Sequence, residues 1–444
     1  MRRQALVLAA LAVAAVLPAT AAARSPATTP IQHLVVLMQE NHSFDNYFGS
    51  YPGADGPPPG VCLPKSFDGK TVGCTPLAHV GGRAVQGLSS DPATFALQYR
   101  AGRMDGFVAA YRVGRGLGNL PNPMGYYDKR DIPVAWELAG QYVLFDRFFS
   151  SARGGSVWNH VFAISGGPGN TGADELPPGG YPRTTTIFDR LQDAGVPWRY
   201  YVRDYDPTNT ILNPAGDRAS QLLQVPLLAM PRFVRTPALA SHIVDLQQFY
   251  KDAQQGRLPA VSYIAPGGLS EHPPTPLAAG QTLVRSIVNE LMRSPEWSST
   301  AFVLTYDSWG GWYDHVRPPK VDKYGYGFRV PSILVSPYAK RGVIVHDTLD
   351  FTSILRFIED NWQLQPLTQR DAKAHSIASA LDFSTDPRQA EFVSAGRVTP
   401  PPAAAKTRAV FWLYGGAFAL ACVLIVGALI GGRRRTPRDA VVES

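Results

Sequence analysis

Several side chains suited to metal binding directly follow apolar runs of the sequence. Glu40 and Asn41 come after the run 31–38, and Asp307 comes after the run 301–306. Carboxylate and amide oxygens of this kind are ligands for Ca²⁺, Mg²⁺ or Mn²⁺, and Zn²⁺ also accepts carboxylates. A metal ion there could activate a nearby hydroxyl as a nucleophile and neutralise the charge of a phosphoryl group. These residues therefore predict a site for one divalent metal ion of undetermined identity.

Ser156 is the candidate nucleophile. It follows Gly154 and Gly155, a sequence typical of entry into a helix whose free N–H groups would face a phosphate. Candidates to hold phosphate oxygens or to protonate a leaving alkoxide are His160, His272 and His315. Taken alone, each group has a simpler explanation, because Ser156 and the Glu40 pair are also typical of caps and turns.

The elements that would position these groups are predicted from apolar runs. Six such runs have the length and composition of buried strands, namely 31–38, 142–145, 198–202, 260–264, 301–306 and 330–335. Helical patterns lie between them, notably at 282–292 and 351–361. The alternation predicts a layered α/β fold with a mostly parallel central sheet. Ligands bind such sheets beyond the carboxyl ends of the strands, so the polar groups are expected to converge on one edge.

The first residues predict export. Arg2 and Arg3 precede an apolar run, 5–17, and the small residues 21–23 then offer a cleavage site. We therefore expect residues 1–23 to be a signal peptide and the mature chain to begin at Arg24. An uncleaved N-terminal anchor is the alternative, although the run is shorter than the ~20 residues of a spanning helix.

The other end of the chain predicts a membrane anchor. Residues 409–432 carry no charge over 24 positions, and 433–435 are all arginine. A positive cluster beside an apolar span favours the cytoplasmic side. The expected organisation is a catalytic domain at 24–385 on the extracytoplasmic side, a Pro/Ala-rich linker at 386–408, one transmembrane helix at 409–432 and a basic cytoplasmic tail at 433–444.

Charge and cysteine content limit the alternatives. The formal charge is +7, but several basic residues lie in the expected signal peptide and tail, and no long basic run interrupts the body. The charge therefore does not predict a nucleic-acid partner. Cys62 and Cys74 lie in a Pro/Gly-rich exported loop, where an oxidising compartment would allow a disulfide. The third cysteine, Cys422, lies within the expected span.

The sequence also resembles a known family. The run Gln39-Glu40-Asn41-His42-Ser43-Phe44-Asp45-Asn46-Tyr47-Phe48-Gly49 resembles the opening motif of the bacterial phosphoesterase family that contains non-specific phospholipases C and respiratory-burst-inhibiting acid phosphatases. Further segments follow in the family's order, at 102–107, 124–127, 156–160, 270–274, 305–316, 329–331 and 336–342. The resemblance spans roughly 31–383. It implies an alkaline-phosphatase-like three-layer sandwich and hydrolysis of phosphoric mono- or diesters through a phosphoserine intermediate.

The resemblance also assigns roles to the site residues. The implied metal ligands are Glu40, Asn41 and Asp307, with Ser308 at a further ligand position. Ser156 would be the nucleophile, His272 and His315 would line the phosphate site, and Asn159 and His160 would bind the substrate. Phospholipid head groups, sugar phosphates and other phosphomonoesters all remain open as substrates.

Two positions depart from the family pattern. Ser308 stands where the family usually has a second carboxylate, so metal affinity is expected to be lower. The family also often has a histidine shortly before the 102–107 segment, but no histidine lies between His79 and Arg103, and Ser89 and Ser90 stand near its expected place. An alternative function is therefore a weakened relative that binds phosphorylated ligands at the cell surface. A structural or adhesive surface protein without any metal is a third reading.

Overall fold

The computed structural model describes residues 26–81, 89–115, 123–169, 174–181, 183–213 and 219–394. All of them belong to one unit of the chain, Met1–Gly396. The expected signal peptide (1–23), transmembrane helix (409–432) and tail (433–444) lie outside the described residues, as does most of the linker at 386–408. Within the described ranges, no helix is both long and apolar enough to cross a membrane.

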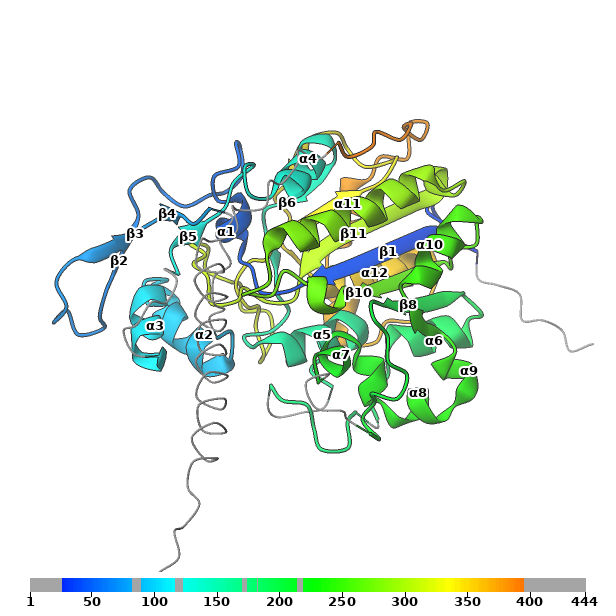
Figure 1. Ribbon diagram of the computed structural model, residues 1–444, viewed down its shortest axis with the longest axis horizontal. Helices are drawn as coiled ribbons and strands as arrows, with labels where there is room; N and C mark the ends of the chain where they lie inside the picture. Colours follow the sequence, from blue (N-terminus) through cyan, green and yellow to red (C-terminus); the bar gives the residue numbers. More distant parts are fainter. Residues whose placement is uncertain are drawn as a thin grey trace, which may run out of the picture. The chain divides into compact units, whose positions relative to one another are not determined.

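An eight-stranded sheet forms the centre of the fold (Figure 1). Its order is β13-β6-β12-β11-β1-β10-β8-β9, and only β12 runs antiparallel to its neighbours. In chain order, the strands of this sheet are β1 (His33–Gln39), β6 (Val143–Phe145), β8 (Trp198–Val202), β9 (Ile243–Asp245), β10 (Val261–Ala265), β11 (Thr300–Tyr306), β12 (Ser332–Val335) and β13 (Val343–Val345). The predicted α/β fold with a mostly parallel sheet is thus confirmed.

The strands recognised from the sequence are those of the sheet interior. All seven residues of β11 are buried, and six of the seven in β1 are buried. Strands covered on both faces read as continuous apolar runs, which is why these elements were predictable. The edge strands β9 and β13 were not predicted, because each has only three residues and is partly exposed.

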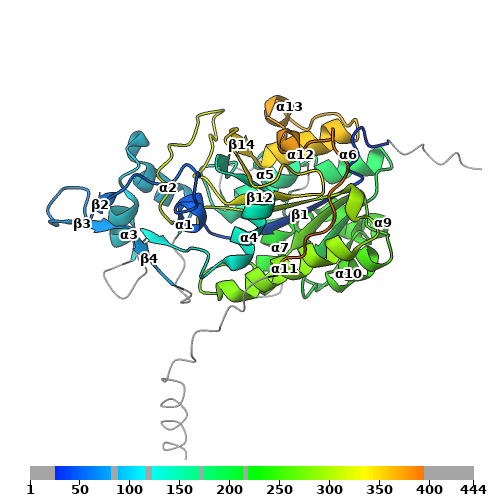
Figure 2. The same ribbon diagram turned by 90° about the horizontal axis from the view of Figure 1, so that it is seen from above.

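Helices cover both faces of the sheet (Figure 2). One layer contains α5 (Ser156–Ser165), α6 (Ile187–Asp193) and α12 (Phe351–Asn361). The other contains α4 (Pro133–Gln141), α10 (Gln247–Gln254) and α11 (Leu277–Arg293). Helix α12 has the predicted bounds, whereas α11 begins five residues before the predicted 282, because its Ala278-Ala279-Gly280 turn carries little apolar periodicity.

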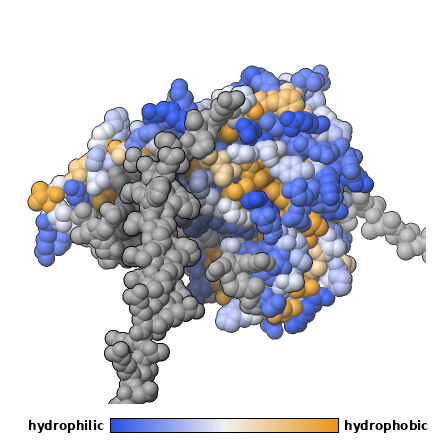
Figure 3. Space-filling model, in the orientation of Figure 1, coloured by the Kyte–Doolittle hydropathy of each residue, from blue (hydrophilic) through white to orange (hydrophobic). Residues whose placement is uncertain are grey.

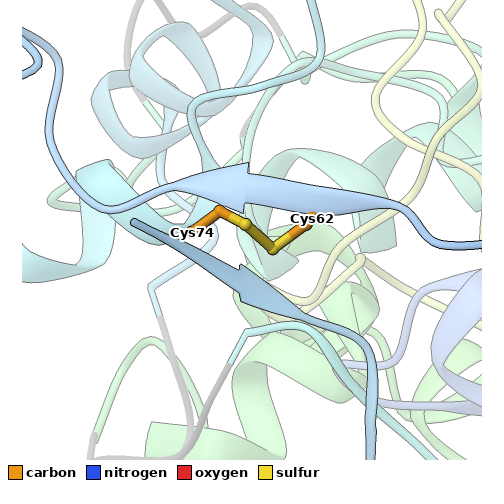
Figure 4. Close-up of a disulfide and its surroundings, with 2 residues drawn as sticks. All are labelled: Cys62 and Cys74. Atoms are coloured by element: carbon orange, nitrogen blue, oxygen red, sulfur yellow. A yellow bond between two sulfur atoms is a disulfide. The ribbon is translucent and has the colours of Figure 1, made fainter. Parts of the chain in front are cut away.

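Shorter elements complete the unit. The remaining helices are α1 (Phe44–Phe48), α2 (Pro92–Tyr99), α3 (Phe107–Arg115), α7 (Ala219–Gln224), α8 (Pro231–Arg235), α9 (Pro237–Ala240) and α13 (Gln369–Lys373). Three two-stranded sheets are formed by β2 (Cys62–Pro64) with β3 (Cys74–Pro76), β4 (Ala78–His79) with β5 (Gly125–Tyr126), and β7 (Phe148–Phe149) with β14 (Leu349–Asp350). Cys62 and Cys74 form a disulfide that joins β2 to β3, the pairing expected from the sequence (Figure 4).

A separate hydrophobic cluster anchors α2 and α3 beside the end of β11. Phe95 of α2 and Phe107 of α3 pack with Trp309, Tyr313 and Phe328. Three of these rings contact one another. Their centroids are 5.7 Å apart for Phe95 and Trp309, 4.6 Å for Phe95 and Phe328, and 5.1 Å for Trp309 and Phe328. These contacts fix the segment that follows Asp307.

Figure 3 shows one face of the molecule. Hydrophilic residues cover much of this face, with hydrophobic residues gathered in patches between them.

Candidate active site

Glu40 and Asp307 are neighbours because the strands that precede them are neighbours. β1 and β11 pair in parallel with Gln39 opposite Tyr306, so both chains leave the sheet at the same level. The Asp307 N–H donates to the Gln39 carbonyl at 3.0 Å, and the Asn41 N–H donates to Asp307 Oδ1 at 3.0 Å. Both carboxyl groups are buried. The convergence expected at the carboxyl edge of the sheet is present for this pair.

A close backbone approach holds Asn41 in place. Asn41 has a φ of 66°, and Gly310 lies against it with a φ of 60°. A Cβ on Gly310 would stand 2.2 Å from the Asn41 carbonyl oxygen, so only glycine fits. The turn after β11 therefore presses the Glu40-Asn41 segment against Asp307.

His160 of α5 completes a buried group of three possible metal ligands. Its Nε2 lies 3.7 Å from Asp307 Oδ2 and 4.0 Å from Glu40 Oε1. One ligand atom from each of the three residues lies within 4.8 Å of the other two. Neither His160 Nε2 nor Asp307 Oδ2 has a hydrogen-bond partner, although both are buried. Unpartnered buried polar atoms are rare and costly, so their convergence indicates a site that could hold a ligand such as a metal ion.

The electrostatics of this group fit a cation. Burial and the charge of Asp307 raise the pKa of Glu40 to about 7, against the opposing charge of His272. Ser270 Oγ and Gln224 Nε2 donate to the Glu40 carboxylate at 2.9 and 3.0 Å. Two carboxylates and an imidazole with free lone pairs form a donor set that suits a divalent ion, which would relieve their repulsion. The residues present therefore fit the metal that the sequence predicted.

Asn41 and Ser308, the other two predicted ligands, lie beside this group and contact each other. Ser308 Oγ donates to Asn41 Oδ1 at 2.7 Å and lies 3.2 Å from Ser90 Oγ. Ser308 is one position at which the sequence is expected to depart from the family pattern, and Ser90 is one of the two serines near the other. The structure thus brings two hydroxyls together beside Asn41. The ligand roles of Asn41 and Ser308 stay predictions.

Ser156 is the first residue of α5, one helical turn before His160. Residues four apart on a helix share a face, so Ser156 and His160 project toward the same side. The N-terminal end of α5 is capped, because Asp174 accepts hydrogen bonds from the N–H groups of Gly155 and Trp158. The start of a helix at Ser156 agrees with the sequence analysis, while its capping by Asp174 was not anticipated.

Asn159, predicted to bind substrate, is a fully buried residue of the first turn of α5. Its Oδ1 accepts from the Ala152 N–H at 2.9 Å, and its Nδ2 donates to the carbonyls of Gly154 and Gly155 at 2.9 Å each. These contacts shape the loop that presents Ser156. A direct contact with substrate stays a prediction.

His272 lies on the loop after β10, next to the carboxylate pair. The Glu40 N–H donates to the Ser270 carbonyl at 2.8 Å, which ties this loop to the end of β1. The imidazole is exposed, and its Nδ1 lies 2.7 Å from the Pro273 carbonyl. The adjacent Glu271 is fully buried and accepts from Tyr47 and Tyr306 hydroxyls at 2.6 Å each. Burial raises the pKa of Glu271, and its hydrogen bonds with the two tyrosines tie the loop to α1 and β11.

His315 lies in a different network from Glu40 and Asp307. Its Nδ1 lies 2.8 Å from Asp45 Oδ2, and its Nε2 lies 3.3 Å from Asp55 Oδ1. Arg329, fully buried, donates to Asp45 Oδ1 at 2.7 Å and to Asp314 Oδ1 at 2.9 Å. The contacts of His315 are with this network, and its role at the phosphate stays a prediction.

Two of the cavities lie at opposite ends of the strands of the central sheet. One of about 560 Å³ is lined by Arg203, Asp204, Tyr205, Gln221, Gln224 and Gly267. Gln224 connects it to the site, since its amide also donates to Glu40. A larger cavity of about 850 Å³ is lined by His33, Trp198, His242 and Glu296 among others, near the amino ends of the strands. Of the two, only the smaller cavity is lined by a residue that contacts the carboxylate pair.

A match to a protein-family model confirms the resemblance to phosphoesterases noted in the sequence. Residues 31–365 match the family described as Phosphoesterase family, which is most of the chain. The chain belongs to the phosphoesterase family, and with it to the hydrolases of phosphoric esters.

Curated relatives are phospholipases C. The chain is 30% identical to phospholipase C B of Mycobacterium tuberculosis over 423 residues, covering 81% of this chain and 79% of that protein. It is 28% identical to non-hemolytic phospholipase C of Burkholderia pseudomallei, covering 80% of this chain and 59% of that one. It is also 28% identical to non-specific phospholipase C6 of Arabidopsis thaliana, covering 81% and 74%.

Solved structures resemble the chain only distantly. A phosphonate monoester hydrolase of Agrobacterium radiobacter is 12% identical with a TM-score of 0.37, covering 79% of this chain and 77% of that one. A protein of the alkaline phosphatase superfamily from Vibrio parahaemolyticus is 12% identical with a TM-score of 0.38, covering 78% and 70%. Overlaps this loose carry no argument about the site.

Proposed function

We propose that the chain is a divalent-metal-dependent phosphoesterase of the phospholipase C or acid phosphatase type, with Ser156 as its nucleophile. The observation that carries this proposal is the buried group of Glu40, Asp307 and His160, in which His160 Nε2 and Asp307 Oδ2 have no hydrogen-bond partner and His160 lies one helical turn from Ser156. A divalent ion held there by Glu40, Asp307 and His160, with Asn41 and Ser308 beside them, would supply positive charge to the phosphoryl group.

The chain's own groups can move the protons of a two-step hydrolysis. Nδ1 of His272 faces a carbonyl, so it carries the ring proton and Nε2 is the basic atom. Ser156 Oγ forms a bond to phosphorus as the bond to the leaving oxygen breaks, and the serine proton passes through His272 to that oxygen. Water then displaces Ser156 from phosphorus, and its proton returns through His272 to Ser156 Oγ.

The test is hydrolysis of p-nitrophenyl phosphate and p-nitrophenyl phosphorylcholine by the full-length chain. We expect release that a chelator abolishes, that Ser156→Ala removes and that Ser165→Ala retains. Ser165 is a matched control because it lies at the other end of α5, where it donates to the Val161 carbonyl. Release that persists in Ser156→Ala, or no release from folded protein with any divalent metal, would contradict the proposal.

A second candidate function is binding of phosphorylated ligands without efficient turnover. Ser308 favours it, because a neutral hydroxyl occupies a predicted ligand position and is already hydrogen-bonded to Asn41. Rapid turnover by the unmodified chain would dismiss this candidate.

We also propose that the enzyme is exported and anchored in the cell membrane by one C-terminal helix, with its catalytic domain on the extracytoplasmic side. The support is the sequence pattern at 1–23 and at 409–432, followed by three arginines. Protease treatment of intact cells should remove the domain while leaving a short membrane-bound fragment. Recovery of intact, protected protein in the cytosol would contradict this location.

A further inference from the structure

Asp174 caps the N-terminal end of α5, where Ser156, the proposed nucleophile, is the first helical residue. Its Oδ1 accepts from the Trp158 N–H at 2.8 Å, and its Oδ2 accepts from the Gly155 N–H. Gly155 itself has no side chain to cap the helix. The Asp174 carboxylate, on the loop after the helix, therefore accepts hydrogen bonds from N–H groups before and after Ser156.

Gly154 and Gly155 leave room for the Asp174 carboxylate because they have no side chains. A Cβ on Gly154 or Gly155 would stand 3.0 Å from Asp174 Oδ2. The Cβ on Gly155 would also stand 3.2 Å from Ser90 Oγ, the hydroxyl that lies 3.2 Å from Ser308 Oγ. Asp174 is thus close to the polar groups that surround the proposed metal ligands.

The electrostatics agree with this placement. Burial raises the pKa of Asp174, the two N–H groups oppose that shift, and the charges of Asp307 and Asp91 add to it. Unpartnered Asp307 Oδ2 and His160 Nε2, both buried, mark the ligand site on the same side of α5. A phosphoryl group attacked by Ser156 would therefore lie close to the Asp174 carboxyl group, which holds the N–H groups of Gly155 and Trp158.

We propose that Asp174 is a specificity-determining residue that disfavours dianionic phosphomonoesters and thereby favours monoanionic phosphodiesters. The proposal rests on the proposed function, because it needs Ser156 to face the phosphoryl group. A monoester carries one more negative charge than a diester near neutral pH, so its repulsion from the Asp174 carboxylate is greater. The same carboxylate also competes for the N–H groups that a phosphate oxygen would otherwise take.

The test compares monoester and diester turnover in matched variants. The variants are Asp174→Asn and Asp174→Ser, which remove the charge and keep a side chain able to cap the helix. Glu175→Gln is the control, since it removes the same charge from the adjacent, exposed residue. The substrates are p-nitrophenyl phosphate and bis(p-nitrophenyl) phosphate, compared by kcat/KM.

We expect both Asp174 variants to raise the monoester-to-diester ratio by about tenfold, from loss of one nearby unit charge, and Glu175→Gln to leave it unchanged. A residue that only caps the helix would change both substrates equally, so an unchanged ratio overturns the proposal. A ratio that moves toward the diester, or that moves as far in Glu175→Gln, overturns it too. If the unmodified enzyme hydrolyses neither of these substrates nor p-nitrophenyl phosphorylcholine, the proposed function itself fails.

A second arm needs no variant and therefore does not depend on their folding. Inorganic phosphate and dimethyl phosphate are compared as competitive inhibitors of the unmodified enzyme at pH 8, where they are mainly dianion and monoanion. We expect inorganic phosphate to bind no more tightly than dimethyl phosphate. Inhibition by inorganic phosphate that is tenfold tighter or more would overturn the proposal.

Discussion

Two buried clusters of similar composition lie on adjacent parts of the molecule. One contains Glu40, Asp307 and His160, and the other contains Asp45, Asp314 and His315. Each has two carboxylates and an imidazole close enough to share an ion. The clusters differ in whether a basic side chain pairs with their carboxylates. Arg329 forms ion pairs with both carboxylates of the second cluster. No arginine or lysine among the described residues forms an ion pair with Glu40 or Asp307.

The difference explains why one cluster is structural and the other is available for chemistry. Arg329 donates to both carboxylates and to the carbonyls of Asp55 and Asp146, and its guanidinium stacks on Phe44 at 4.5 Å. In the first cluster, His160 Nε2 and Asp307 Oδ2 have no partner. A buried carboxylate pair needs a cation, and since no described arginine or lysine pairs with the first cluster, a metal ion is the cation that fits it.

The largest expected effect is on catalysis at the first cluster. Asp307→Asn removes a ligand charge, so kcat/KM for the better p-nitrophenyl substrate should fall by about a thousandfold. Stability without metal should not fall, because the repulsion with Glu40 is relieved. Kinetics and urea unfolding measure the two quantities. Activity within tenfold of the unmodified enzyme would contradict the assignment of Asp307.

The second cluster should instead govern folding. Arg329→Met leaves Asp45 and Asp314 buried without their cation, so the free energy of unfolding should fall by about 3–5 kcal/mol. Urea denaturation followed by circular dichroism measures it. Arg341→Met is the control, since Arg341 pairs with Glu391 at the surface and its loss should change little. Equal effects of the two variants would remove the distinction between the clusters.

Adding charge to the first cluster should strengthen it. Ser308→Asp places a carboxylate beside Asn41, so the dissociation constant of the divalent ion should fall on the order of tenfold. Calorimetric titration with Ca²⁺, Mg²⁺, Mn²⁺ and Zn²⁺ measures the change. The same substitution in an Asp307→Asn background should not restore binding. Weaker binding in Ser308→Asp would show that Ser308 lies outside the coordination sphere.

The smallest expected effect is a pH dependence of the second cluster. Burial opposes protonation of His315, but the hydrogen bond and charge of Asp45 outweigh it and raise the pKa of His315 above 6.5. Protonated His315 therefore adds stability that is complete below 6.5 and is lost as pH rises through the raised pKa. Urea midpoints between pH 6 and 9 should show this loss in the unmodified chain and in His375→Gln, an exposed control. An identical pH profile in His315→Gln would contradict it.

The sequence predicted the parts of the site that strand ends determine. Glu40 and Asp307 follow buried strands, and parallel pairing of those strands places them together. It could not separate His160 from His315, because their surroundings depend on tertiary contacts. The turn at Trp309–Trp312 leads His315 toward Arg329, whose pairing with Asp314 carries no local signal. Asp174 was missed for the same reason, since its loop contains no motif and only folding brings it to α5.

Metal stoichiometry tests the central claim most directly. Elemental analysis of the full-length protein, dialysed with one divalent metal at a time, would be compared with Asp307→Asn and Asp131→Asn. Asp131 belongs to a third group, with His79 and Asp128, that is partly exposed and equally composed of carboxylates and imidazole. We predict one ion per chain in the unmodified protein and in Asp131→Asn, and none in Asp307→Asn. An ion that remains in Asp307→Asn and disappears in Asp131→Asn would contradict the account.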